Sequence, residues 1–447
     1  MKPVHPLPRA TSRRTFLARA AAGAALFSLS GRAAAPARRR VPPGDKLNLG
    51  VVGVAGRGGD NLKGVSSENI VALCDVDATR LAEAAQAHPA AAKYADWRRL
   101  LERPDLDGLV VSTPDHTHAV IISAALDLGL PVYAEKPLTH TVSEARHLLK
   151  KVRAAGVPTQ TGNQIHSGTN YRRVVELIQS GAVGPVREVH HWVDGGWDAK
   201  PWPAAEPVPA GLDYDLWVGP VEWRDFSKEW VPFNWRRWWH WGGGTLADFC
   251  CHHMDLGVWA LQLGRPTRVE AEGPPVDAHC APPWLVVRYD FPARTVTTLD
   301  GRPNISLPPV KLTWYHGGKR PPQLAELGQD KWGAGTLFVG ERGFLLADYG
   351  RHLLLPEAKF SGFTRPAAFI ADSPGHHAEW IRACKGEGRP HSPFEYGLQL
   401  TEIGLLGNVA FRAGCALEWD AEAGRLKNCP AAEEFLQHRY RAGWRLA

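Results

Sequence analysis

Cysteine is scarce in this chain, and its spacing shows no metal or disulfide signature. The seven cysteines are an odd number and include no C-x-x-C pair. This excludes a zinc finger and gives no indication of a disulfide scaffold. Apolar residues make up 44% and charged residues 22% of the chain, as in a globular protein. That composition excludes a disordered, collagen-like or coiled-coil chain.

An excess of positive charge is also lacking outside the amino-terminal segment. The formal net charge is +6, but residues 1–33 contain six Lys or Arg and no acidic residue. The rest of the chain has 46 basic and 46 acidic residues. Nucleic-acid-binding proteins present clustered excess positive charge. We therefore expect no nucleic-acid partner.

Long apolar runs are absent beyond residues 1–35, so no stable membrane span is expected in the mature protein. Within this segment, Arg13 and Arg14 precede the apolar stretch Ala20–Leu29 and then small residues, with a cleavage position after Ala33. This order is typical of a twin-arginine export signal, although a disordered basic tail is the alternative. We expect a signal peptide and a periplasmic or other extracytoplasmic location.

The twin-arginine route carries folded proteins, so a cofactor can be inserted before export. This predicts a tightly held cofactor. It also fits cysteines without a disulfide pattern, because folding would take place in a reducing compartment.

A glycine-rich turn follows the first buried strand, Leu47–Val52. It has the pattern G-x-A-x-x-G over residues 53–58. Gly53 permits a tight turn, Ala55 leaves room for a pyrophosphate, and Gly58 permits close packing of helix and strand. The phosphates would lie at the N-terminus of the next helix, where free N–H groups favour anions.

An acidic residue follows the second strand at the position expected for ribose recognition. Strand Ile70–Cys74 ends at Asp75, 22 positions after Gly53. A carboxylate at this spacing binds the ribose 2′-hydroxyl and would repel a 2′-phosphate. We therefore expect NAD rather than NADP. Asp75 could also act as the N-cap of a helix over Ala78–Ala91.

Strands and helices continue to alternate after this point. Strands are expected at Gly108–Ser112 and Val132–Ala134, and helices at His118–Leu128 and Ser143–Ala155, the last with a capping box at Thr141. Such alternation predicts an α/β fold with a doubly wound parallel sheet. Ligands then bind at the carboxyl ends of the strands.

Several motifs resemble the Gfo/Idh/MocA family of glucose–fructose oxidoreductase, inositol dehydrogenase and rhizopine-catabolism proteins. They are Thr113-Pro114-Asp115-His116-Thr117-His118, Glu135-Lys136-Pro137, Gly162-Asn163-Gln164, Gly242–Asp248, Cys251–Asp255 and Glu402–Ala410. Exported members of the family often carry a twin-arginine signal.

The resemblance implies a Rossmann domain over residues 46–165 and an α/β substrate domain over 166–447. The second domain would have a large open, mainly antiparallel sheet, with late helices packing back on the first domain. A homo-oligomer, a dimer or tetramer, is expected as in relatives. The implied catalytic residues are Lys136, Asp248 and His252. The cofactor-binding candidates are Gly53, Ala55, Gly56, Arg57, Gly58, Asp75, Thr113, Pro114, Asp115, His118, Glu135, Lys136 and Asn163.

The candidate catalytic residues suit hydride transfer at a sugar carbinol. A histidine titrates near neutral pH, so His252 can accept the hydroxyl proton. A helix capped by Thr245 would place Asp248, His252 and Asp255 on one face. Asp248 would then hold the imidazole or bind a sugar hydroxyl. The Lys136 ammonium could polarise the reacting oxygen, or a lowered pKa could make it a proton donor.

A metal site is the alternative interpretation of the histidines. His252, His253, Asp248 and Asp255, with His190-His191 upstream, include ligand types that zinc accepts. His252 and His253 are adjacent, however, and neighbouring side chains on a helix point about 100° apart. We therefore expect no metal.

Tryptophan is concentrated in one part of the chain. Ten of the 18 tryptophans lie between Trp192 and Trp241. Their rings could stack on sugar faces, or they could brace a long loop or an oligomer interface. The substrate-binding candidates are Lys136, Asn163, Trp235, Arg236, Asp248 and His252.

The sequence therefore predicts an exported NAD-dependent oxidoreductase that acts on a sugar or polyol with a tightly bound cofactor. One alternative is an NAD-dependent, redox-neutral glycoside hydrolase that acts through a keto-sugar intermediate. Another is a non-catalytic NAD-binding protein, because a fold can outlive its chemistry.

Overall fold

The computed structural model describes residues 40–446. The expected signal peptide, residues 1–35, lies outside this range. Within residues 40–446, no helix has both the length and the apolar character needed to cross a membrane.

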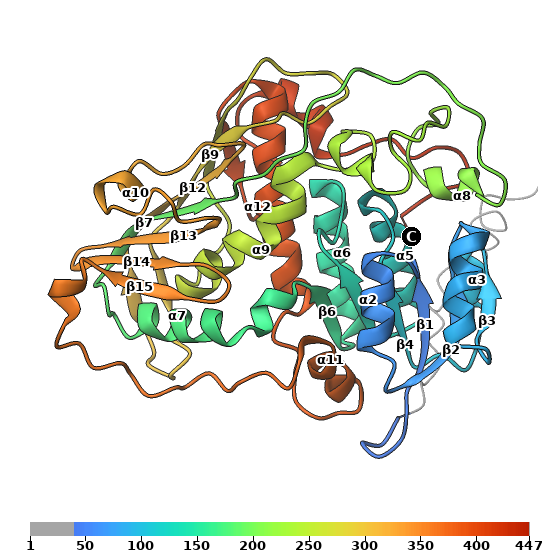
Figure 1. The fold of residues 1–447 in the computed structure, drawn as a ribbon, viewed down its shortest axis with the longest axis horizontal. Helices are drawn as coiled ribbons and strands as arrows, with labels where there is room; N and C mark the ends of the chain where they lie inside the picture. Colours follow the sequence, from blue (N-terminus) through green and yellow to red (C-terminus); the bar gives the residue numbers. More distant parts are fainter. Residues whose placement is uncertain (1–39, 447) are drawn as a thin grey trace, which may run out of the picture. The chain divides into compact units, whose positions relative to one another are not determined.

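The amino-terminal half contains a six-stranded parallel sheet with helices alternating along the chain (Figure 1). The strand order is β3-β2-β1-β4-β5-β6, which confirms the predicted doubly wound sheet. Strands β4 and β5 are completely buried, as expected for central parallel strands. The strands are β1 (Asn48–Val52), β2 (Asn69–Cys74), β3 (Ala92–Tyr94), β4 (Gly108–Val111), β5 (Val132–Glu135) and β6 (Thr159–Gly162). The helices are α2 (Arg57–Gly64), α3 (Ala78–Ala87), α4 (Trp97–Leu101), α5 (Asp115–Asp127) and α6 (Val142–Ala155).

Helix ends follow local signals, with one correction. The capping box of α6 forms as predicted, with Thr141 accepting from the backbone N–H of Glu144. The N-cap of α3 is Asp77, which accepts from two backbone N–H groups, and not Asp75. The Asp75 carboxylate instead accepts a hydrogen bond from the backbone N–H of Val54 in the glycine-rich turn.

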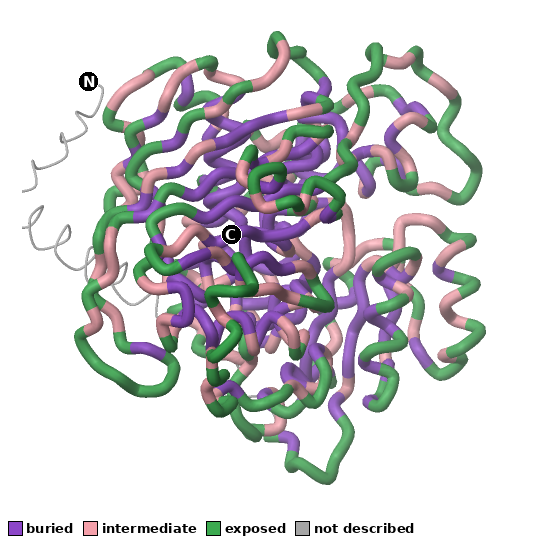
Figure 2. Tube along the Cα trace, turned by 60° about the vertical axis from the view of Figure 1, so that its left-hand side comes forward, coloured by how far each residue is buried: buried purple, intermediate pink, exposed green. Residues whose placement is uncertain are grey.

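The carboxyl-terminal half is built on a nine-stranded mixed sheet, in the order β15-β14-β13-β7-β12-β9-β8-β16-β17. Its only parallel pair is β7 with β12, so the expected mainly antiparallel sheet is confirmed. Figure 2 shows buried stretches of the chain running side by side through the interior. The strands are β7 (Val186–Trp192), β8 (Arg268–Glu272), β9 (Leu285–Phe291), β12 (Val310–His316), β13 (Gly335–Gly340), β14 (Gly343–Ala347), β15 (His352–Leu355), β16 (Leu417–Asp420) and β17 (Arg425–Leu426). A separate hairpin pairs β10 (Arg294–Val296) with β11 (Ile305–Leu307).

Helices from this half reach the first sheet's helices. The helix α12 contacts α6, and α11 contacts α2. The remaining helical elements are η1 (Gln164–Ser167), α7 (Thr169–Gln179), α8 (Tyr214–Val218), η2 (Asn234–Arg237), α9 (Gly244–Ala260), α10 (Gln323–Glu326), η3 (Glu357–Phe360), α11 (His376–Cys384), α12 (Phe394–Ala413) and η4 (Pro430–Leu436).

The tryptophan-rich stretch, residues 193–243, leaves the second sheet after β7 and crosses to α3 (Figure 1). We call it the excursion. It has its own small core, in which Trp230, Trp238 and Trp241 are almost fully buried. A β-bridge joins Leu212 to Asp77 at the start of α3. Backbone pairing therefore fastens the excursion to the start of α3.

A disulfide between Cys415 and Cys429 corrects the expectation drawn from cysteine spacing. The two residues are 14 positions apart, on either side of the β16–β17 hairpin. Sequence spacing could not reveal this pair because the turn of the hairpin brings its two sides together.

Candidate active site

A cavity of about 690 Å³ lies at the carboxyl ends of the parallel strands, and α9 and the excursion also contribute to its wall. Its size is within the range of small-molecule sites. Three predicted residues, Gly58, His118 and Asn163, do not line it. The predicted residues that line it are Gly53, Ala55, Gly56, Arg57, Asp75, Thr113, Pro114, Asp115, Glu135, Lys136, Trp235, Arg236, Asp248 and His252.

Two glycines make the turn between β1 and α2 possible. Gly53 has φ +81°, and a Cβ there would lie 2.6 Å from the Ser112 carbonyl oxygen. A Cβ at Gly58 would lie only 2.0 Å from the Gly53 carbonyl oxygen. Gly58 therefore has a packing role, because the absence of a side chain lets α2 approach the end of β1 closely.

The residues of this turn fit a dinucleotide pyrophosphate. Within residues 40–446, no hydrogen bond engages the backbone N–H groups of Ala55, Gly56 or Arg57. The N-cap of α2 is Gly56, which supplies no side-chain cap. A Cβ at Gly56 would meet nothing within 4 Å, so the turn is open on its cavity side. Free N–H groups at a helix N-terminus form an anion site.

Asp75 stands beside the turn but is already engaged with backbone. Its carboxylate accepts hydrogen bonds from the N–H groups of Val54 and Asp77, each at 3.0 Å. Burial raises its pKa above the ordinary range despite these bonds. Arg80 also lines the cavity, with its Nε 3.3 Å from the carboxylate of Asp77. Arg80 could not be predicted from the residues directly after Asp75, because it lies five positions further on and the fold brings it to the cavity.

The excursion adds residues that motif reasoning did not identify. Leu212, Leu216 and Trp217 line the same cavity. The Trp217 carbonyl oxygen lies 2.8 Å from Nε2 of His116, which belongs to α5. The tryptophan cluster was the available signal, but its spacing did not indicate which rings would face the cleft.

Lys136 and Asp248 form a tight ion pair in the cavity wall. The Lys136 Nζ donates to Asp248 Oδ1 and to the Asp248 backbone oxygen, both at 2.6 Å. Burial opposes the charge on Lys136, but the Asp248 carboxylate outweighs it and raises the lysine pKa. Burial likewise opposes the charge on Asp248, and Lys136 with Arg236 lowers that pKa. Lys136 is therefore a fixed ammonium and not a neutral amine.

Further groups surround the Asp248 carboxylate. Trp197 Nε1 donates to Oδ2 at 3.2 Å, and Arg236 Nε lies 3.6 Å from Oδ1. The Arg236 guanidinium lies 4.5 Å from the ring centroid of Phe233 and 4.3 Å from that of Trp235. Arg236 is thus held by two rings while it faces the ion pair.

His252 is oriented by Asn163 and not by Asp248, which excludes one of the two roles expected for Asp248. Its Nδ1–H donates to Asn163 Oδ1 at 2.8 Å. This leaves Nε2 with a lone pair, on a ring that lines the cavity. Burial, followed by the charge of Lys136, lowers the His252 pKa well below 6.5. The imidazole is therefore neutral and able to accept a proton at neutral pH.

The predicted start of the α9 helix is wrong. The α9 helix begins at Gly244 with Gly243 as N-cap, and Thr245 does not cap it. The Thr245 hydroxyl accepts instead from the Trp197 N–H at 2.7 Å. Asp255 lies on the same helix as Asp248 and His252, as predicted, but it does not line the cavity, and its buried carboxylate lies 2.9 Å from Nδ1 of His166.

His118 has a structural place. Its two ring nitrogens lie 2.8 and 2.7 Å from the carbonyl oxygens of Pro137 and Thr113. Burial lowers its pKa to about 4. The ring therefore ties the end of α5's first turn to the loop that carries Lys136.

The histidines are also directed apart. The His253 Nε2 is bonded to the hydroxyl of Tyr349 at 2.9 Å, whereas His252 faces Asn163. In the part of the chain that the structure describes, no group of three or more His, Cys, Asp or Glu is placed to hold a metal ion.

Exposed aromatic rings border the ion pair. Phe233 is 57% and Phe249 37% exposed, and both line the cavity. Trp235 lines it but is only 4% exposed, and Trp238 is buried in the core of the excursion. The most exposed rings of the cavity lining are therefore phenylalanines, which the tryptophan count did not reveal.

Two family models match the chain. Residues 47–163 match the NAD-binding Rossmann fold of the Gfo/Idh/MocA oxidoreductase family. Residues 168–306 match the C-terminal α/β domain of the same family. The chain belongs to the Gfo/Idh/MocA oxidoreductase family.

Individual relatives are distant. The chain is 31% identical over 186 residues to inositol 2-dehydrogenase of Leifsonia xyli subsp. xyli, covering 36% of this chain and 55% of that enzyme. It is 28% identical over 143 residues to the uncharacterized oxidoreductase YrbE of Bacillus subtilis, covering 31% and 42%. The chain thus matches about half the length of these relatives.

Solved structures share the fold over a longer stretch. The WlbA dehydrogenase of Bordetella pertussis, in complex with NADH and UDP-GlcNAcA, has a TM-score of 0.56 at 18% identity and covers 84% of this chain and 99% of its own. Levoglucosan dehydrogenase, in complex with NADH and L-sorbose, has a TM-score of 0.55 at 16% identity, with 84% and 99% covered.

Proposed function

We propose that this protein is an NAD-dependent oxidoreductase that acts on a secondary alcohol of a sugar or polyol. The observation that carries the proposal is the juxtaposition of a neutral His252 and a charged Lys136 in the wall of one cleft. The relatives named as inositol 2-dehydrogenase and levoglucosan dehydrogenase support this substrate class.

The two residues have different tasks in the oxidation of an alcohol. Nε2 of His252 accepts the hydroxyl proton, while Asn163 keeps the proton on Nδ1. The ammonium of Lys136 stabilises negative charge that develops on the reacting oxygen. Asp248 keeps that ammonium protonated and aimed. NAD, when bound, supplies the acceptor for the hydride.

The aromatic border suits a ring with apolar C–H faces. Phe249 offers an exposed face beside Lys136, whose Nζ lies 5.9 Å from its ring centroid, and Phe233 offers one beside Arg236. Arg236 offers hydrogen-bond donors to hydroxyl groups, since its guanidinium is held in place by Phe233 and Trp235.

We further propose that NAD is preferred over NADP and is held tightly. The Asp75 carboxylate beside the turn opposes a 2′-phosphate. The excursion supplies Leu212, Leu216 and Trp217 to the cleft and is fastened to α3, so release of a dinucleotide would require its displacement. Export by the twin-arginine route, proposed from residues 1–35, would favour such a resident cofactor.

The test is a screen of polyols, sugars and glycosides with the purified protein, followed by nicotinamide absorbance and product analysis. We expect reduction of NAD by one class of polyol or sugar, with loss of turnover in Lys136→Met and in His252→Asn. Asp75→Ser should raise the efficiency with NADP relative to NAD. Cleavage of a glycoside without net redox change would replace this proposal by the hydrolase. NAD binding without turnover of any substrate would leave a binding protein.

A further inference from the structure

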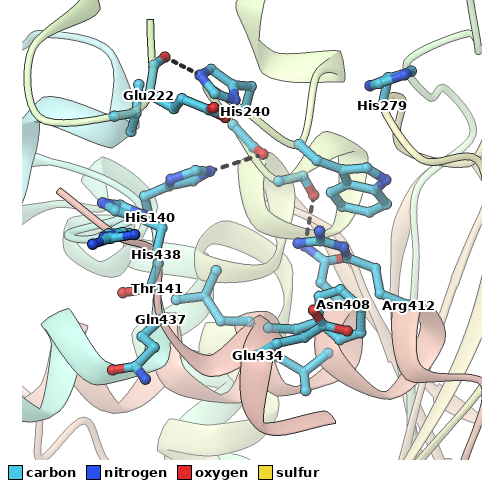
Figure 3. A pocket seen from close by; sticks show the side chains of 18 of the residues that line it. His140, Thr141, Glu222, His240, His279, Asn408, Arg412, Glu434, Gln437 and His438 are labelled. Atoms are coloured by element: carbon cyan, nitrogen blue, oxygen red, sulfur yellow. Dashed lines mark hydrogen bonds between the residues drawn. The ribbon is translucent and has the colours of Figure 1, made fainter. Parts of the chain in front are cut away.

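A second cavity, of about 970 Å³, is lined by residues from both halves of the chain, and none of them belongs to the proposed oxidoreductase site (Figure 3). It shares no lining residue with the dinucleotide cleft. Its walls come from the N-terminus of α6, the excursion, α12, η4 and the carboxyl-terminal residues 437–442. Arg441 fastens those last residues to the excursion through Asp215 at 2.6 Å.

A half-buried cation in this cavity, Arg412, lacks a protein partner among the described residues. Within the described residues, the Arg412 guanidinium makes no hydrogen bond and no ion pair. It is held between two aromatic rings, 5.1 Å from the ring centroid of Trp239 and 4.3 Å from that of Phe435. Burial lowers its pKa to about 10, so it remains charged at neutral pH. A charge that is partly removed from water and left unpaired favours an anionic ligand.

The other charged side chains of the lining do not neutralise Arg412. Arg224 is paired with Glu222 at 2.7 Å, and Arg441 with Asp215. Arg439 also lines the cavity without a hydrogen bond or ion pair among the described residues, but it is exposed to solvent. Glu434 acts on Arg412 through space but forms no ion pair with it among the described residues. Three of the four lining histidines add no charge, because burial lowers the pKa of His140 to about 3, that of His438 to about 4, and that of His240 below its ordinary value.

The remaining lining combines an exposed ring with polar groups. Trp202 is 37% exposed and lines the cavity beside His279, with ring centroids 4.7 Å apart. Figure 3 shows Arg412, Asn408 and Glu434 on one side, and His140, Thr141 and Gln437 on the other. A planar guanidinium matches a carboxylate, and an indole face suits the C–H face of a sugar ring.

We propose that this second cavity binds a sugar acid, with its carboxylate on Arg412 and its ring against Trp202. The proposal goes beyond the dehydrogenase function, because it concerns a separate site. The cavity nevertheless adjoins the catalytic helix. The Nε2 of His140 lies 3.2 Å from the Gly242 carbonyl oxygen, and Asn408 donates to Gly243, the N-cap of α9, at 2.8 Å.

The experiment is calorimetric titration of the full mature chain, saturated with NAD, with D-glucuronate. D-glucose serves as the neutral analogue and inorganic phosphate as the bare anion. We expect saturable binding of glucuronate, at least tenfold weaker binding of glucose and phosphate, and at least a tenfold loss in Arg412→Gln. Arg389→Gln, which removes an exposed arginine that does not line the cavity, should bind as the parent does.

A second variant, Glu434→Gln, should change the affinity in the opposite direction. Removing an exposed negative charge near Arg412 should tighten glucuronate binding several-fold. Lys136→Met should leave the affinity unchanged. The proposal is overturned if glucuronate does not bind, if phosphate binds as tightly, or if Arg412→Gln and Glu434→Gln bind as the parent does. Loss of binding in Lys136→Met would assign the ligand to the dinucleotide cleft instead.

Discussion

Replacement of Asp248 by Asn should bring the titration of Lys136 into the measurable pH range. In the parent protein the Asp248 carboxylate, 2.6 Å from Nζ, raises the lysine pKa above 10.5 although burial opposes the charge. His252 has a pKa well below 6.5. The required forms are neutral His252 and charged Lys136. Parent kcat/KM should therefore rise with pH below 6.5 and then stay level to above 10.5.

The variant removes the charge that offsets burial of the ammonium. Breaking a partly or fully buried charge pair costs ~2–5 kcal/mol. At about 1.4 kcal/mol for each pKa unit, this corresponds to a fall of about 1.5–3.5 units. Because Lys136 acts in its protonated form, activity is lost as pH rises through its pKa. An alkaline limb should therefore appear in Asp248→Asn, at a lower pH than any alkaline limb of the parent protein.

The assay is the pH dependence of kcat/KM for the best substrate, at saturating NAD. Asp330→Asn, which removes an exposed acidic side chain outside the cleft, is the matched control and should keep the parent profile. A parent profile that already falls near neutral pH would refute a fixed ammonium. An alkaline limb that does not move in Asp248→Asn would refute the role given to the ion pair.

Three further predictions concern the proton acceptor, the glycine turn and the disulfide. His252→Asn should lower kcat by ~10²–10⁴-fold, with NAD affinity unchanged in a fluorescence titration; an unchanged kcat would move the proton acceptor elsewhere. Gly58→Ala should lower the free energy of unfolding by about 1–3 kcal/mol and weaken NAD binding, because its Cβ would meet the Gly53 carbonyl at 2.0 Å. Denaturant titration measures the loss, and an unchanged free energy of unfolding would show that the turn relaxes around the new methyl group. Removing the disulfide in Cys415→Ser/Cys429→Ser should lower that free energy by about 3 kcal/mol, since it closes a loop of 14 positions; equal stability would contradict this.

Much of the first sheet could be predicted because its signals are local. The glycine turn, the buried strands and the capping box at Thr141 each lie within a few consecutive residues, and all three are found. The one local error, Asp75 as N-cap, arose because two aspartates lie within three residues and either can cap a helix. The structure gives that role to Asp77.

The partners within the site could not be predicted because they are distant in sequence. Lys136 and Asp248 are 112 positions apart, and His252 and Asn163 are 89 apart. Helix periodicity favoured a partnership between Asp248 and His252, which share a helix. Lys136 pairs with the Asp248 carboxylate instead, because a buried ammonium needs a carboxylate more than a neutral imidazole does.

The excursion shows a second limit of sequence reasoning. Its tryptophans were expected to divide between support and substrate contact, but composition does not distinguish the two. Trp238 and Trp241 serve the core, whereas Phe233 provides the exposed face. Which rings are buried and which are exposed depends on how the excursion packs, including its backbone bridge at Leu212, and no local sequence pattern encodes this packing.

The most direct test of the central claim is to identify the nucleotide that the protein carries. The purified protein would be denatured, and the supernatant analysed by absorbance and mass spectrometry, with an NAD titration of the stripped protein. The account predicts released NAD close to one per chain and rebinding that Gly58→Ala weakens. No released nucleotide, together with no NAD binding on titration, would contradict the dinucleotide site and every catalytic role assigned from it.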